Sequence, residues 1–184
     1  AAERALAEGG HDALSLRALA REIGVDPAAA YRHFPNKNAL LSTLAAAGFD
    51  ALGQQLAAAL EAPGAGLRAA CGAYLAFGVA HPHRYRLMFA GTCPAEALAE
   101  ARQVAPELLV PDAPSAFGLL TQVLDGLWAQ RGLPAATRPG AELLVWSLVH
   151  GAVGLFIDGR VGGLTPEGLA DRITAVLVGG LGAG

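Results

Sequence analysis

The sequence is poor in cysteine, lysine and aromatic residues, and it carries no excess of positive charge. Its two cysteines, Cys71 and Cys93, have neither the density of a disulfide-stabilised secreted domain nor the spacing of a metal site, so they favour a protein of the reducing cytoplasm. The formal net charge of -3 excludes a protein that binds nucleic acid over its whole surface. Any nucleic-acid-binding surface on this chain must therefore be local.

Long apolar runs are also absent. The most apolar stretch, residues 143–157, is interrupted by Ser147 and His150 and is too short to cross a bilayer comfortably. The first residues do not have the pattern of a signal peptide. Alanine accounts for much of the 53% hydrophobic content, the chain also has 24 glycines, and aromatic residues make up only 6%. Such a composition favours closely packed helices, so we expect an all-α fold.

Residues 15–37 predict two short helices joined by a tight turn. In the first helix apolar residues recur at helical spacing, and Ser15 precedes it as an N-cap. Gly24 stands where a left-handed C-cap is needed, and Asp26 and Pro27 supply a second N-cap and a proline at the first helical position. Two helices with so short a connection cross steeply. This arrangement is a helix-turn-helix, whose second helix enters the DNA major groove.

The side chains of the second helix, expected over about 27–34, suit DNA. Ala28 and Ala29 are small enough to let the backbone approach base edges. Arg32 can reach guanine or a phosphate, and Tyr31 and His33 beside it have polar tips suited to phosphate oxygens. The alternative, a helical hairpin that only packs, does not explain why caps, turn and phosphate-binding residue types coincide.

Residues 24–41, GVDPAAAYRHFPNKNALL, resemble the DNA-binding signature of the TetR family of bacterial transcriptional regulators. The shared features are a Gly-Val turn, a recognition helix that ends in Tyr-x-His-Phe, and a lysine that opens the next helix. Asp26 departs from the Ser or Thr usual in the family, and Ala30 replaces a larger apolar residue. The resemblance implies a helix-turn-helix head over 1–48 and a helical effector-binding and dimerisation domain over 49–184, with about nine helices in all.

Carried over position by position, the resemblance implies two kinds of DNA contact, with phosphates and with bases. Arg17, on the polar face of the first helix, is a further expected DNA contact. The expected phosphate contacts are Ser15, Tyr31, His33 and Lys37, and the residues expected to face bases are Pro27, Ala28, Ala29 and Arg32.

The charge of the head is weak for a DNA-binding domain. Residues 1–50 hold five basic and six acidic side chains. The sequence begins as if in the middle of a helix, and family members usually carry a basic arm before it. We therefore expect that a basic N-terminal arm is missing from this sequence.

Beyond the head, apolar stripes and proline or glycine breaks predict the remaining elements. Helices are expected over about 36–62, 67–80, 81–89, 115–132, 141–159 and 166–178, with a partly helical connector at 91–115 and a linker at 133–140. In TetR-like proteins the helix after the head joins head to body. The resemblance therefore implies that a shift in the body tilts the recognition helix.

The body contains a Trp-x-x-x-His-Gly pattern at 146–151, which together with the aromatic and basic segment 81–89 resembles one subgroup of TetR C-terminal domains that bind small molecules. We expect a pocket for an apolar or aromatic effector, although each of its residues also fits an ordinary helical core. The expected lining residues are Tyr74, Phe77, Leu87, Met88, Phe117, Leu120, Trp128, Trp146 and His150.

The helix over 141–159 is apolar nearly all round, so it must be buried on more than one side. One side can be the core of the body, and the other most simply meets a second copy. The resemblance implies a homodimer through 141–159 and 166–178, which form a four-helix interface. Such a dimer sets two recognition helices about 34–36 Å apart on one face of DNA.

Metal and catalytic sites are poorly supported. His81, His83 and His150 have no cysteine or acidic ligand nearby in sequence, and Ser147 near His150 lacks a third partner. We therefore expect no metal, no cofactor and no enzyme. The leading hypothesis is a ligand-responsive repressor that binds a pseudo-palindromic operator. The alternatives are a small-molecule sequestering protein with a vestigial head, and an activator or DNA-organising protein without an effector.

Overall fold

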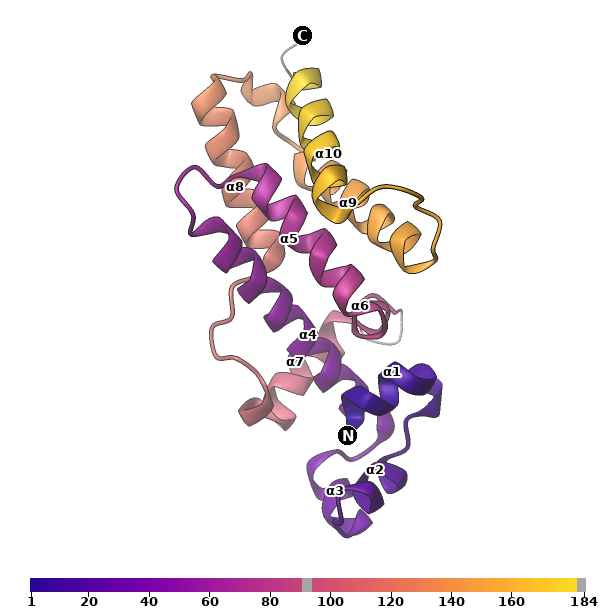
Figure 1. Cartoon of the computed structure of the whole chain (residues 1–184). Helices are drawn as coiled ribbons and strands as arrows, with labels where there is room; N and C mark the ends of the chain where they lie inside the picture. The colour runs from indigo at the N-terminus through magenta and orange to yellow at the C-terminus, as the bar shows by residue number, and fades with distance from the viewer. Residues whose placement is uncertain (91–93, 182–184) are drawn as a thin grey trace. The chain divides into compact units, whose positions relative to one another are not determined.

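The computed structural model describes residues 1–90 and 94–181, and within them every regular element is a helix. The expected all-α fold is therefore confirmed. Its helices are α1 (Ala2–Ala13), α2 (Leu16–Glu22), α3 (Pro27–His33), α4 (Lys37–Leu60), α5 (Leu67–Ala80), α6 (Pro82–Met88), α7 (Ala95–Val104), η1 (Pro106–Leu108), α8 (Ala116–Arg131), η2 (Ala135–Thr137), α9 (Ala141–Ile157) and α10 (Pro166–Leu181) (Figure 1).

Packing divides the chain into two compact units. The first contains residues 1–51 and 81–113, and the second contains 52–80 and 114–184. Helix α4 belongs to both, and the segment with α6, α7 and η1 packs in the unit that contains the helix-turn-helix. Packing thus follows a different division of the chain from the expected functional one at residue 48.

Glycines and capping side chains set the ends of the first helices. Gly10 has φ of 68° and ψ of -174°, so α1 is interrupted there. Ser15 caps α2 by accepting a hydrogen bond from Ala18 N, and Asp26 caps α3 by accepting one from Ala28 N. Gly24 between them has φ of 73°, a conformation that costs glycine little. The turn chemistry predicted for the helix-turn-helix is present.

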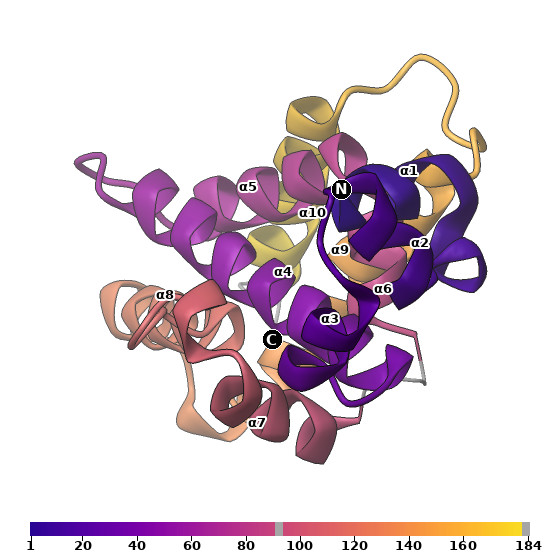
Figure 2. The ribbon, with the colours of Figure 1, turned by 90° about the horizontal axis from the view of Figure 1, so that it is seen from below.

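The first unit is held together by a cluster of buried leucines with contributions from four helices and the α1–α2 connection. Leu87 of α6 belongs to this cluster, and α6 contacts α1 (Figure 2). The other members are Leu6, Leu14, Leu16, Leu19, Leu40, Leu41 and Ala45. The head core therefore includes a side chain that lies far beyond the helix-turn-helix in sequence.

Two further contacts hold the first half of α4 in this unit. A Cβ on Gly48 would lie 2.7 Å from Met88 Sδ, so glycine is needed for the close approach of α4 and α6. Asp50 accepts hydrogen bonds from the Arg102 guanidinium of α7 and from Val110 N at 3.0 Å. These contacts fix α6, α7 and the segment after η1 on α4.

In the second unit α5 is the central helix, which contacts α8, α9 and α10. It approaches α9 closely at Gly78, where a Cβ would lie 2.3 Å from Cγ1 of the fully buried Val153. The second half of α4 approaches the start of α8 as closely, because a Cβ on Gly53 would lie 1.8 Å from the Pro114 carbonyl oxygen. Small residues thus permit the tight helix packing that the composition suggested.

Among the described residues, no helix combines the length and the apolar character needed to cross a membrane. The connector expected at 91–115 contains α7 and η1, so it is partly helical as predicted. Cys93 lies outside the described residues, while Cys71 is buried in α5. Burial raises the pKa of the Cys71 thiol to about 12, so this side chain is an unreactive part of the core.

Candidate DNA-binding head and body site

The expected recognition helix α3 exposes its side chains to solvent. None of its residues is buried, and the Tyr31 side chain is 42% exposed. Ala28, Arg32 and His33 are also exposed, while Pro27 and Ala29 are partly covered. A seven-residue helix without a buried residue is fixed by its caps and by contact with α2. Its outer surface is therefore available to a partner.

The remaining expected DNA contacts lie at the starts of α2 and α4. Ser15 is the N-cap of α2, and the exposed Arg17 follows it. Lys37 is the first residue of α4, which Asn36 caps by accepting a hydrogen bond from Ala39 N at 2.8 Å. Helix N-termini carry partial positive charge and free N–H groups, which suit phosphate oxygens. The nine residues therefore all belong to the helix-turn-helix and its two boundaries.

Three acidic side chains of the head have specific partners. Arg4 of α1 donates a hydrogen bond to the Glu22 carboxylate at the end of α2, so these two charges cancel and leave the balance unchanged. The carboxylate of Asp26 serves as a helix cap, and that of Asp50 is buried against Arg102. Since Arg102 lies outside 1–50, only the Asp50 pair makes the head less acidic than its own charge count indicates.

In the body, a hydrogen-bonded chain joins α5 to α9. Trp146 Nε1 donates to the Tyr74 hydroxyl at 3.1 Å, and that hydroxyl lies 3.3 Å from His150 Nδ1. Because an indole nitrogen can only donate, the Tyr74 oxygen accepts from Trp146, and the hydroxyl bridges the two side chains of α9. Partial burial lowers the pKa of His150, which favours the neutral imidazole.

The rest of the expected effector-binding set is distributed over both units. Phe117 of α8 packs edge to face on Trp146 with ring centroids 6.3 Å apart, and Phe77 and Leu120 are buried in the second unit. Leu87 belongs to the head core and Met88 packs against Gly48, both in the first unit. Tyr74, Trp146, His150 and Phe117 therefore form one connected group, which we call the aromatic cluster.

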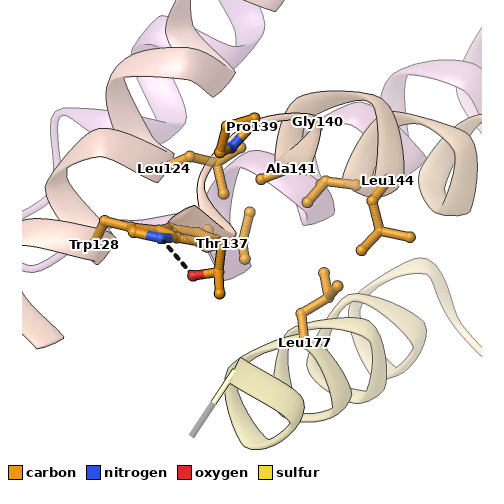
Figure 3. Close-up of a pocket in the computed structure, with 10 residues that line it drawn as sticks. Leu124, Trp128, Thr137, Pro139, Gly140, Ala141, Leu144 and Leu177 are labelled. Carbon is orange, nitrogen blue, oxygen red and sulfur yellow. Dashed lines mark hydrogen bonds between the residues drawn. The ribbon is translucent and has the colours of Figure 1, made fainter. Parts of the chain in front are cut away.

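Trp128, the last of the nine, lines a separate cavity of about 130 Å³ in the second unit (Figure 3). The cavity lies among the start of α5, the end of α8, the segment around η2, the start of α9 and the C-terminal part of α10. Its lining is Leu67, Leu124, Trp128, Thr137, Pro139, Gly140, Ala141, Leu144, Val145 and Leu177. Sequence reasoning missed the other nine residues. Three of them lie in 133–140, which has the composition of an ordinary linker, and the six on helices have no feature that separates them from ordinary core residues.

Helices α9 and α10 leave large apolar side chains in solvent. Leu143 is 62% exposed and Leu155 is 53% exposed on α9, and Val176 on α10 is 73% exposed. Leu144 and Leu148 are exposed as well. Both helices therefore leave large apolar side chains uncovered in the described part of the chain.

Two family models match the chain and together cover the head and the body. Residues 1–44 match the model described as "Bacterial regulatory proteins, tetR family", and residues 67–179 match "Tetracyclin repressor-like, C-terminal domain". The chain belongs to the TetR family. It is therefore a DNA-binding transcriptional regulator with a helix-turn-helix head, as its sequence predicts.

Several solved structures have a similar fold. A protein of unknown function from Rhodococcus sp. RHA1 is 28% identical, with a TM-score of 0.78 over 97% of this chain and 90% of that one. The TetR family transcriptional regulator PfmR from Thermus thermophilus is 20% identical, with a TM-score of 0.68 over 96% and 94% of the two chains. A tetR family regulatory protein from Rhodococcus RHA1 is 18% identical, with a TM-score of 0.61 over 96% and 90%. No curated protein matches the chain.

Within the described residues of this TetR-family chain, no group of three histidine, cysteine or acidic side chains is placed to hold a metal ion. His81 is the N-cap residue of α6 and His83 lies in its first turn. Ser147, one helical turn from His150, is exposed on α9. The TetR family is a family of regulators.

Proposed function

We propose that the protein is a transcriptional repressor that binds a pseudo-palindromic operator as a homodimer and is released by an apolar or aromatic small molecule. The observation that carries the DNA-binding part is α3, a capped helix whose outer surface combines small residues with Tyr31, Arg32 and His33. The repressor role is supported by the body's match to a tetracycline-repressor-like domain. Such a regulator acts in the cytoplasm, on the nucleoid.

The homodimer is supported by α9, which has two apolar faces. Its buried face includes Val145, Val149 and Val153, which contribute to the core of the second unit. Leu144, Leu148, Gly151 and Leu155 follow one another at three- or four-residue spacing and are exposed. Together with Val176 of α10 they form a surface suited to a second copy. The geometry of such a dimer then sets the spacing of the two recognition helices.

The effector site that we propose is built around the aromatic cluster. Aromatic rings with polar tips favour ligands that are mostly apolar but carry one or two hydrogen-bonding groups. The residues of the cluster come from three helices, with Tyr74 on α5, Phe117 on α8 and Trp146 on α9. A ligand bound there would therefore bias how these helices pack. A ligand changes DNA affinity only if it binds one arrangement of the body more tightly than another.

Selection of bound sequences from random duplex DNA, with the full-length protein, tests the DNA-binding part of the proposal. A repressor of this kind enriches a two-fold symmetric site. A plot of the logarithm of its binding constant against the logarithm of the salt concentration should have a slope of about -0.9 for each phosphate that the protein neutralises. Enrichment of asymmetric sequences alone would contradict the homodimer. A folded, dimeric protein that enriches nothing would support the alternative, a sequestering protein whose head is a scaffold.

A titration of operator binding with candidate apolar and aromatic molecules tests the effector part. Release by a ligand that binds the dimer, together with loss of that response in Trp146→Phe, would support the aromatic cluster as the site. Saturation of the body by a ligand without any change in operator affinity would contradict the allosteric proposal. Tighter operator binding on addition of the ligand would make the ligand a co-repressor.

A further inference from the structure

The cavity beside Trp128 has walls fixed by a hydrogen-bonded linker. Thr137 Oγ1 accepts a hydrogen bond from Trp128 Nε1 at 3.2 Å and donates one to the Pro134 carbonyl at 2.7 Å. Figure 3 shows the Trp128–Thr137 bond at the edge of the cavity, with Leu144 and Leu177 facing each other across from it. The linker is therefore bound to α8 before any ligand arrives.

Arg138, the residue between the two lining positions 137 and 139, strengthens this attachment. Its guanidinium donates to Asp125 Oδ1 at 2.9 Å and lies 2.7 Å from Glu142 Oε1. It also lies over the Trp128 ring, 5.5 Å from the ring centroid. The hydrogen bond from Arg138 lowers the pKa of Glu142 to about 2, so the pair is ionised over the whole physiological range. The cavity wall is thus preformed.

The lining of the cavity is apolar. Among the side chains that line it, the two polar groups are Trp128 Nε1 and Thr137 Oγ1, which are bonded to each other. The cavity is partly open to solvent, since Thr137, Pro139 and Gly140 are exposed. A water molecule held there needs two to four polar partners, and the lining offers only this bonded pair, so an apolar guest displaces such water readily. Its deep wall is formed by the buried Leu124, Val145 and Leu67.

We propose that this cavity binds a small uncharged apolar molecule of single-ring size. The volume of about 130 Å³ is close to that of engineered apolar cavities, about 150 Å³, that hold benzene. A guest there touches α5, α8, α9 and α10 together, and it lies apart from the aromatic cluster, whose residues do not line the cavity. The site does not depend on DNA binding, so it can be tested without an operator.

The two tryptophans of the chain provide the measurement. Trp128 lines the cavity and Trp146 belongs to the aromatic cluster. In the full chain with 15N-labelled indoles, benzene should shift the Trp128 Nε1 resonance saturably and leave that of Trp146 in place. Equal shifts of both resonances, or a linear dependence on benzene without saturation, would overturn the proposal. Operator binding is not part of this measurement. A failure of the cavity proposal can therefore be distinguished from a failure of the proposed repressor function.

A filling substitution and a matched control sharpen the test. Ala141→Leu places three more carbons in the cavity and should weaken benzene binding at least tenfold, while Ala58→Leu at an exposed position of α4 should leave it within twofold. An unshifted Trp146 resonance reports that each variant is folded. Undiminished benzene binding in Ala141→Leu would overturn the assignment to this cavity.

Two further measurements keep the proposal testable if Ala141→Leu does not fold. Val145→Ala enlarges the cavity and should move the preference from benzene towards naphthalene, whereas an unchanged preference contradicts the site. The titration is also repeated over a range of protein concentrations. If the affinity for benzene falls as the chain dimerises, a side chain of the second copy fills the cavity in the dimer. That result would overturn the small-molecule proposal.

Discussion

Tyr74 of α5 and His150 of α9 are joined by a hydrogen bond of 3.3 Å between the phenol oxygen and Nδ1. Trp146 Nε1 donates to the same oxygen, so the Tyr74 hydroxyl bridges the two side chains of α9. Partial burial lowers the pKa of His150, so the folded protein favours the neutral imidazole in this contact.

This arrangement predicts a loss of stability in acid. Burial lowers the pKa of folded His150 below its ordinary value of 6.5, so at a pH between the two values the unfolded chain binds more protons. Stability is fully present above about pH 6.5 and is lost as the pH falls towards the folded pKa. In calorimetry, the wild type should lose more thermal stability between pH 7.5 and 5.5 than His150→Asn, which keeps an acceptor for Tyr74. An identical acid response in the two proteins would contradict the role of His150.

Arg32→Ala should cost about 1–3 kcal/mol of operator affinity, mainly at one base position, if Arg32 reads a base. Lys37→Ala should instead weaken binding to all sequences alike and reduce the salt slope by about 0.9. Binding titrations with the operator and its single-base variants at several salt concentrations separate the two effects. Arg131→Ala, which removes an exposed arginine at the end of α8, is the control. A uniform loss in Arg32→Ala would make Arg32 a phosphate contact.

The Asp50–Arg102 pair predicts an asymmetric response to mutation. The Asp50 side chain is 3% exposed and that of Arg102 is 46% exposed. Arg102→Ala leaves a buried carboxylate without its counter-charge and should cost about 1.5–3 kcal/mol of unfolding free energy, towards the lower end because solvent screens the guanidinium. Adding Asp50→Asn should recover part of that loss in urea unfolding. Gln103→Ala, the exposed neighbour on α7, should be nearly neutral, and a double variant no more stable than Arg102→Ala would argue against a charge effect.

Gly78→Ala should destabilise the second unit by about 1–3 kcal/mol through overpacking, because the new Cβ would lie 2.3 Å from Val153 Cγ1. Val153→Ala in the same chain removes the clashing methyl groups and should restore part of the stability. Gly126→Ala on α8, where a Cβ meets nothing within 4 Å, should stabilise by about 0.5–1 kcal/mol through helix propensity. Thermal unfolding of the wild type, of the Gly78→Ala, Val153→Ala and Gly126→Ala variants and of the double variant checks this order. Additive effects of the Gly78 and Val153 changes would show that the two residues do not interact.

The helix-turn-helix was readable from sequence because its determinants are local. Ser15, Gly24 and Asp26 act on backbone groups within five residues, so their spacing alone specifies caps and turn. The aromatic cluster was readable in part, since Trp146 and His150 are one helical turn apart and face the same partner, Tyr74. Their residue types indicated a polar contact in an apolar helix.

The cavity beside Trp128 and the membership of the head core could not be read in this way. Thr137 acquires its role through a bond to Trp128, nine residues earlier, and Leu177 reaches the same cavity from the last helix. Leu87 was expected to line an effector pocket, and it lies in the leucine cluster of the first unit. An apolar side chain has no signature of which core it joins, because burial is non-directional.

The position of Leu87 in that cluster limits how freely the head can be separated from the rest of the chain. A fragment that ends with α4 would retain each residue expected to touch DNA and would lose a leucine that is 2% exposed, which leaves a void in the small core. Grafting residues 1–48 onto the body of another regulator would likewise transfer the residues expected to contact DNA without Leu87, which packs in the core beneath them. Exchange of DNA specificity between such proteins has to carry a matching α6 along with the head.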